Sequence, residues 1–134
     1  MSASQPAANT NRPLSPHLQI YKPIPTMVMS IVHRITGAAL YVGTLLVAWW
    51  LIAAASGPDY FAFVNGFFGS WFGMLVLFGY TWALIHHMLG GLRHFAWDLG
   101  HLFEKHTATK LAWANLAGSV VLTLAVWIVG AVAQ

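Results

Sequence analysis

The chain has 134 residues, of which 58% are hydrophobic and only 7% are charged. A soluble domain has about a quarter of its residues charged, so this composition excludes an ordinary water-soluble domain and indicates a membrane protein. The net charge of +3 is no nucleic-acid signature, and the absence of cysteine excludes disulfides, thiolate zinc sites and self-contained iron–sulfur clusters, so redox chemistry must use histidine or a partner.

The first 25 residues differ in composition from the rest of the chain. Residues 1–11 are small, polar and uncharged and lack the basic start of a signal peptide, so we interpret them as a disordered tail. Residues 12–25 contain four prolines, which exclude a continuous helix, while apolar residues recur between them. We expect residues 1–25 to end in an ordered segment at the membrane surface or against a partner, with a flexible linker as the alternative. Residues 26–134 then form the membrane domain.

Three apolar segments are long enough to cross a bilayer, which takes about 20 residues of helix. The first spans about 27–55 and ends where Ser56 to Asp59 supply a helix stop and a turn. The second spans about 65–92 and the third about 111–132. We therefore predict an all-α membrane protein with three transmembrane helices.

All six lysine and arginine residues fall on one side of this arrangement. They lie before or at the start of the first helix and between the second and third, at Arg12, Lys22, Arg34, Arg93, Lys105 and Lys110. Cytoplasmic loops carry the excess of positive charge, so we expect the N-terminus in the cytoplasm and the C-terminus in the periplasm.

Two adjacent histidines lie in the last turns of the second segment, which carries no charge before them. Histidine is rare inside a membrane without a function. At about 100° per residue, His87 shares a helix face with Ala83, Gly91 and His94, whereas His86 points elsewhere. An imidazole flanked by small residues suits an axial haem ligand, because the macrocycle must lie close to the backbone. We favour His87, although spacing does not exclude His86, and the alternative is a hydrogen bond to a neighbouring helix.

Further polar residues gather at the same end of the predicted bundle. Arg93 and His94 have the position and the charge to neutralise haem propionates, with snorkelling to the lipid headgroups as the alternative. Ser30, His33 and Arg34 share one face of the first helix. Ser30 could donate a hydrogen bond to a quinone carbonyl, and Arg34 could stabilise the negative charge of reduction. The simpler alternative is a snorkelling Arg34 with Ser30 as a helix cap.

Three ordered motifs resemble a known family. They are RPLSPHLQIY at residues 12–21, SIVHRITG at 30–37 and HMLGGLRH at 87–94, the last followed by Trp97 and Asp98. Together they resemble the cytochrome b membrane-anchor subunit of succinate dehydrogenase, respiratory complex II. The resemblance extends from about Arg12 to the third helix.

The resemblance implies a three-helix anchor that pairs with a second membrane-anchor subunit and holds a flavoprotein and an iron–sulfur subunit on the membrane. It implies that His87 supplies one axial ligand to a haem b and the second anchor the other. It also implies that Ser30 and Arg34 form part of the ubiquinone site and that His33 and His94 lie near the haem propionates. FAD and the iron–sulfur clusters would then belong to the partner subunits only.

We therefore expect a subunit of succinate:ubiquinone oxidoreductase in the bacterial inner membrane, acting in electron transport and the tricarboxylic acid cycle. The chain alone is not expected to be an enzyme, because it offers no catalytic carboxylate pair or activated nucleophile. The alternative functions are a purely structural anchor, a quinol-dependent fumarate reductase anchor, and a small transporter or channel subunit. The last is disfavoured because the outer halves of the helices offer few polar residues to line a path.

Overall fold

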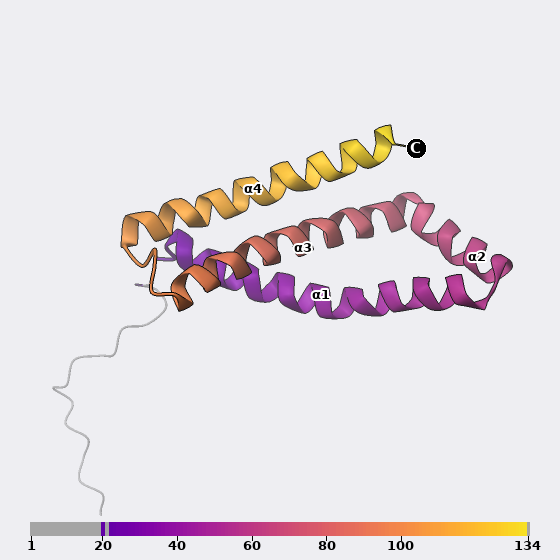
Figure 1. Ribbon diagram of the computed structural model, residues 1–134, viewed down its shortest axis with the longest axis horizontal. Helices are drawn as coiled ribbons and strands as arrows, with labels where there is room; N and C mark the ends of the chain where they lie inside the picture. Colours follow the sequence, from indigo (N-terminus) through magenta and orange to yellow (C-terminus); the bar gives the residue numbers. More distant parts are fainter. Residues whose placement is uncertain (1–19, 21, 134) are drawn as a thin grey trace, which may run out of the picture.

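The computed structural model describes residues 20 and 22–133, and that part of the chain is all-helical (Figure 1). Four helices follow one another: α1 (Pro25–Ser56), α2 (Pro58–Gly69), α3 (Trp71–Asp98) and α4 (Lys105–Val132). The predicted tail at residues 1–11, and most of the predicted surface segment at 12–25, lie outside the described residues.

Three of these helices, α1, α3 and α4, are long and apolar enough to cross a membrane. With a rise of 1.5 Å per residue, their 32, 28 and 28 residues correspond to lengths of about 40 to 50 Å. This exceeds the ~30 Å hydrocarbon core of a bilayer, so the helix ends reach the headgroup regions. The prediction of an all-α protein with three membrane-spanning helices is confirmed.

The predicted start of the second span, about residue 65, is wrong. A separate helix, α2, occupies 58–69, and α3 begins only at Trp71. Ser70 adopts an extended conformation, and its hydroxyl accepts a hydrogen bond from the Gly73 backbone nitrogen at 3.1 Å, so it caps α3. Gly73 packs directly on the α2 backbone at Phe67 and Phe68, where a Cβ atom would overlap it. The turn was not predicted because apolar residues continue on both sides of Ser70.

The loop between α3 and α4 is shorter than the sequence predicts, because α3 continues to Asp98 and α4 begins at Lys105. The Glu104 carboxylate caps α4 by accepting hydrogen bonds from the backbone nitrogens of His106 and Thr107, at 3.0 and 2.8 Å. These bonds favour the charged carboxylate and hold the pKa of Glu104 below its ordinary value. The apolar pattern predicted only the membrane-embedded part of α4, because the first turn of this helix is polar.

The helices form a hairpin with a third long helix packed beside it (Figure 1). α1 and α3 run antiparallel and are joined at one end by α2, and α4 runs antiparallel to α3. At the α2 end, Ala53, Val64 and Phe68 form a small buried apolar cluster. At the other end, α1 and α4 approach each other, since Met29 and Ala112 line the same pocket.

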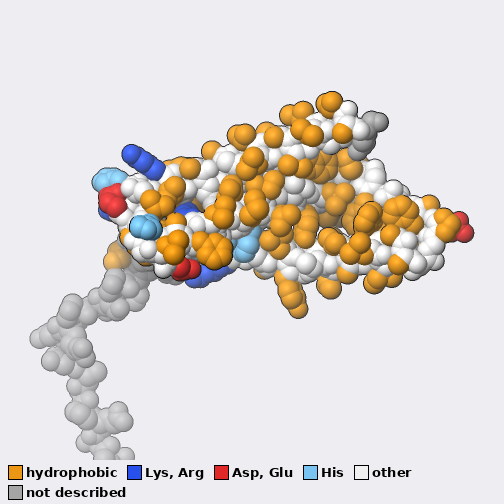
Figure 2. Space-filling view, in the orientation of Figure 1, with side chains coloured by type: hydrophobic (Ala, Val, Ile, Leu, Met, Phe, Trp, Pro, Cys, Tyr) orange, Lys and Arg blue, Asp and Glu red, His pale blue; other side chains and the backbone are white. Residues whose placement is uncertain are grey.

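Most large apolar side chains lie on the outside (Figure 2). Tyr41 and Leu45, for example, are 80% and 67% exposed. Exposed apolar area on this scale marks a surface for lipid or for other subunits. Lysine and arginine side chains gather at the end of the molecule where α1 and α4 begin and α3 ends (Figure 2).

Candidate functional site

Two histidines meet where α1 packs against α3. The imidazole rings of His33 and His87 stack with their centroids 3.9 Å apart and their planes only 4° from parallel. Both side chains are half-buried. Neighbouring helices come this close only where small residues leave room for the rings.

Glycine supplies that room on both helices. A Cβ atom built on Gly37 of α1 would lie 2.9 Å from Cε1 of His87, and one built on Gly90 of α3 would lie 2.5 Å from Nδ1 of His33. Each imidazole therefore rests against a glycine of the opposite helix. The pairing is reciprocal, and any side chain at either glycine displaces a ring.

Hydrogen bonds fix the orientation of His87. Its Nδ1 atom lies 3.1 Å from the backbone carbonyl oxygen of His33 and 3.4 Å from the hydroxyl of Thr36. The Thr36 hydroxyl donates to the same carbonyl at 2.9 Å. Because a carbonyl oxygen only accepts, the bond to it assigns the proton to Nδ1 of His87. The Nε2 atom then carries a free lone pair, which is the arrangement in metal-ligating histidines.

The adjacent histidine faces a different helix. His86 is only 1% exposed, and its Nδ1 atom lies 3.1 Å from the Ser119 hydroxyl and 3.2 Å from the Asn115 amide nitrogen, both on α4. Its ring is therefore committed to polar contacts between helices α3 and α4. The two histidines that sequence spacing left open thus differ in their surroundings, and only His87 presents a nitrogen without a partner among the described residues.

The surroundings of His87 fit a haem. Within the part of the chain that the structure describes, no group of three or more His, Cys, Asp or Glu side chains could hold a bare metal ion. A haem needs none, because the macrocycle supplies four nitrogens and the protein only the axial ligands. Gly91, one turn beyond His87 on the same face, has nothing within 4 Å of a Cβ position. The helix face that carries His87 is thus open one turn further along, at Gly91.

The structure separates Arg93 from His33 and His94, the other two residues expected near the haem propionates. His94 is exposed, and its ring centroid lies 5.1 Å from that of His33, so it belongs with the histidine pair. Arg93 is only 7% exposed and lines a pocket between α3 and α4. Its guanidinium carbon lies 5.0 Å from the ring centroid of Trp97. Arg93 therefore faces α4 more than it faces His87.

Ser30 and Arg34 are both exposed on α1. No hydrogen bond joins either side chain to another described residue, and neither lines the pocket between α1 and α4 or the one between α3 and α4. They occupy adjacent turns of one helix face near the basic end. A binding site at this position would require walls from other chains.

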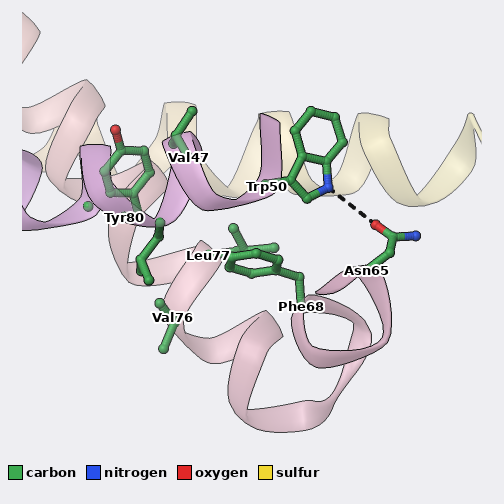
Figure 3. Close-up of a pocket in the computed structure, with 9 residues that line it drawn as sticks. Val47, Trp50, Asn65, Phe68, Val76, Leu77 and Tyr80 are labelled. Atoms are coloured by element: carbon green, nitrogen blue, oxygen red, sulfur yellow. Dashed lines mark hydrogen bonds between the residues drawn. The ribbon is translucent and has the colours of Figure 1, made fainter. Parts of the chain in front are cut away.

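A third pocket lies between α1, α2 and α3, towards the α2 end (Figure 3). Its volume is about 320 Å³, and its walls are almost entirely apolar. Trp50 donates a hydrogen bond to the Asn65 side-chain oxygen at 3.4 Å across its rim (Figure 3). No lysine, arginine, histidine, aspartate or glutamate lines it, so it offers no charged group for redox or proton chemistry.

Three residues of the site escaped the sequence analysis. Thr36 helps to orient His87, Gly90 seats His33, and Asn115 contacts His86. The sequence indicated the role of Thr36 only weakly, through its helical spacing from His33. It gave no means of choosing Gly90 over Gly91, because both glycines are compatible with a close helix contact.

The sequence is similar to known proteins over most of its length. Residues 8–126 match the family described as succinate dehydrogenase/fumarate reductase transmembrane subunit. The chain is 47% identical over 119 residues to the succinate dehydrogenase cytochrome b556 subunit of Paracoccus denitrificans, covering 89% of this chain and 92% of the relative. It is 34% identical over 128 residues to the protein of that name from Rickettsia felis, covering 96% and 100%. It is also 44% identical over 101 residues to the succinate dehydrogenase cytochrome b560 subunit of Marchantia polymorpha, covering 70% and 72%.

Proposed function

This chain belongs to the family of succinate dehydrogenase/fumarate reductase transmembrane subunits, and we propose that it is a haem-ligating anchor of succinate:ubiquinone oxidoreductase. It is a multi-pass inner-membrane protein with three apolar spans. In this role it holds a flavoprotein and an iron–sulfur subunit on the membrane together with a second anchor. Succinate oxidation, FAD and the iron–sulfur clusters belong to those partners.

The orientation of His87 carries the proposal of a haem site. Its Nδ1 proton is committed to the His33 carbonyl, so Nε2 is the nitrogen free to bind iron. His87 would hold a haem b from this side, and the second anchor would supply the opposite ligand. When bound, the haem supplies a one-electron carrier. The His33 ring stacks on His87, and the His94 ring lies next to that of His33. In this proposal both imidazoles donate hydrogen bonds to the haem propionates.

We assign Ser30 and Arg34 to the ubiquinone site. Both are exposed near the basic end of α1, with Ser30 one turn before His33 and Arg34 directly after it, so an incoming quinone would meet them from outside this chain. The serine hydroxyl can donate a hydrogen bond to a quinone carbonyl, and the guanidinium stabilises negative charge as the ring is reduced. Their exposure supports a site completed by partner subunits.

The orientation in the membrane is proposed from the distribution of positive charge, which is concentrated at the same end of the molecule. The described lysine and arginine residues cluster where α1 and α4 begin. Positive residues favour the cytoplasmic side, so the N-terminus is cytoplasmic and the C-terminus periplasmic in this proposal. The quinone and haem residues then face the side on which the soluble partners bind.

The quinone assignment is tested on the purified complex with Ser30→Ala and Arg34→Gln. We expect ubiquinone reduction to fall about tenfold or more for each, while succinate oxidation with a soluble artificial electron acceptor stays unchanged. Thr44→Ala removes an exposed hydroxyl further along α1 and serves as the control. Equal loss of both activities, or of neither, would instead favour a purely structural anchor.

A further inference from the structure

A groove between α3 and α4 has a volume of about 360 Å³ and no role in the proposed haem or quinone sites. Its walls are apolar except at Arg93 and Asn115. Leu92 and Leu111 line it near the basic end, and Leu122 lines it further into the membrane. It therefore runs along the helices rather than across them.

Arg93 brings a charge into this apolar groove, and apart from the Trp97 ring no described residue pairs with it. The side chain is 93% buried, and its Nε and Nη1 atoms are buried with no hydrogen-bond acceptor among the described residues. A buried guanidinium without acceptors is strongly unfavourable. An anionic acceptor is needed to satisfy it.

The chain cannot supply that anion from its own side chains. It contains only three acidic residues. Asp59 lies in the first turn of α2, at the other end of the molecule, and Glu104 is engaged in capping α4. Asp98 is exposed at the end of α3, and no ion pair joins it to Arg93. Within residues 20 and 22–133, no side chain supplies the acceptor.

We propose that the groove binds one phospholipid, with an acyl chain along its apolar walls and the phosphate against Arg93. The guanidinium presents neighbouring N–H groups that match two phosphate oxygens. Arg93 precedes the end of α3 by five residues, so it lies about 7.5 Å below the helix end, near headgroup depth. A carboxylate from a soluble partner would satisfy the charge but would leave the apolar length of the groove unexplained.

The groove also argues against a haem propionate as the acceptor. The His33–His87 stack lies between α1 and α3, whereas the groove is lined by α3, α4 and the loop between them. An acceptor that enters the groove therefore approaches from the α4 side. A lipid phosphate and a haem propionate can be distinguished by substituting Arg93. Loss of a propionate contact should alter the haem spectrum, whereas loss of a phosphate contact should not.

The test uses the purified complex, stripped of lipid in detergent and titrated with dioleoylphosphatidylglycerol while native mass spectrometry counts the bound lipids. We expect Arg93→Gln to weaken the tightest lipid-binding event about tenfold or more and to leave the haem spectrum unchanged. Lys110→Gln removes an exposed cation at the same end and should bind lipid normally. Inorganic phosphate should not compete at the same concentrations.

A second pair of variants tests the groove while Arg93 stays in place. Gly118 lines the groove, and Gly118→Leu should fill it and exclude the acyl chain, whereas Gly130→Leu, on the same helix but in open space, should not. Lipid binding that survives either Arg93→Gln or Gly118→Leu overturns the proposal. Displacement of the lipid by inorganic phosphate, or an altered haem spectrum in Arg93→Gln with unchanged lipid binding, overturns it as well.

Discussion

The imidazoles of His33 and His87 stack at 3.9 Å, and the carbonyl of His33 lies 3.1 Å from Nδ1 of His87. One residue of α1 thus contacts both the ring face and the ring edge of a residue of α3. The contact holds the two helices at a fixed register and sets which nitrogen of His87 carries the proton and which is left without a hydrogen-bond partner among the described residues. The proposed haem ligand is positioned by backbone and by glycine as much as by side chains.

Gly37→Ala is expected to lower haem content, because the new methyl group would lie 2.9 Å from Cε1 of His87 and would push the ring out of place. Gly66→Ala on α2 has nothing within 4 Å and should leave haem unaffected. Haem per complex is measured by the pyridine haemochrome absorbance. Equal haem in Gly37→Ala and the natural complex would contradict the tight packing of this ring.

Gly91→Leu tests the surface beside the ligand. The position has no described atom within 4 Å of a Cβ, so the fold tolerates a larger side chain there. In the proposed site, however, that space borders the macrocycle, and leucine should exclude it. We expect an assembled complex without haem, measured by subunit composition on a native gel and by haem absorbance. Full haem content would show that the macrocycle lies elsewhere.

His86→Ala should weaken the packing of α3 on α4 without removing the haem. The change leaves the Asn115 amide and the Ser119 hydroxyl without their buried partner, which costs about 1 kcal/mol. We expect a lower midpoint of thermal unfolding for the purified complex. Thr44→Ala, at an exposed hydroxyl, is the control and should leave the midpoint unchanged.

Glu104 should make the first turn of α4 sensitive to pH. Its pKa is lowered in the folded chain, chiefly by the hydrogen bond from the His106 backbone nitrogen and then by those from Thr107. The cap therefore contributes fully above the unfolded pKa and is lost as the pH falls through the lowered folded pKa. The protection of the His106 and Thr107 amides, that is, the intrinsic exchange rate of an unstructured peptide at the same pH divided by the measured rate, should be high near pH 7 and lower below that pKa. In Glu104→Ala, the His106 and Thr107 amides should be less protected from exchange than the amides deeper in α4 at every pH.

The sequence predicted the three spans because each is a long apolar run, and the bilayer imposes that requirement directly. It did not predict the break at Ser70, because apolar residues continue on both sides and the turn depends on Gly73 packing against α2. It also placed the start of α4 too late, since Lys105 and the cap at Glu104 are polar.

Helical periodicity placed His86 and His87 on different faces but did not say which neighbours those faces meet. The choice depends on α4, whose Asn115 and Ser119 reach His86, and on α1, whose Gly37 and Thr36 meet His87. Such contacts join residues far apart in the chain. The same limitation applies to Arg93, which shares a motif with His94 but faces the α3–α4 groove.

The most direct test of the proposed function is a dithionite-reduced minus oxidised optical spectrum of the purified complex, recorded for the natural chain, His87→Ala and His86→Ala. The account predicts b-type bands in the natural complex and in His86→Ala. In His87→Ala it predicts their loss or a shift to a five-coordinate form. Loss of the bands in His86→Ala with retention in His87→Ala, or no haem in the natural complex, would contradict the assignment of His87 as the axial ligand.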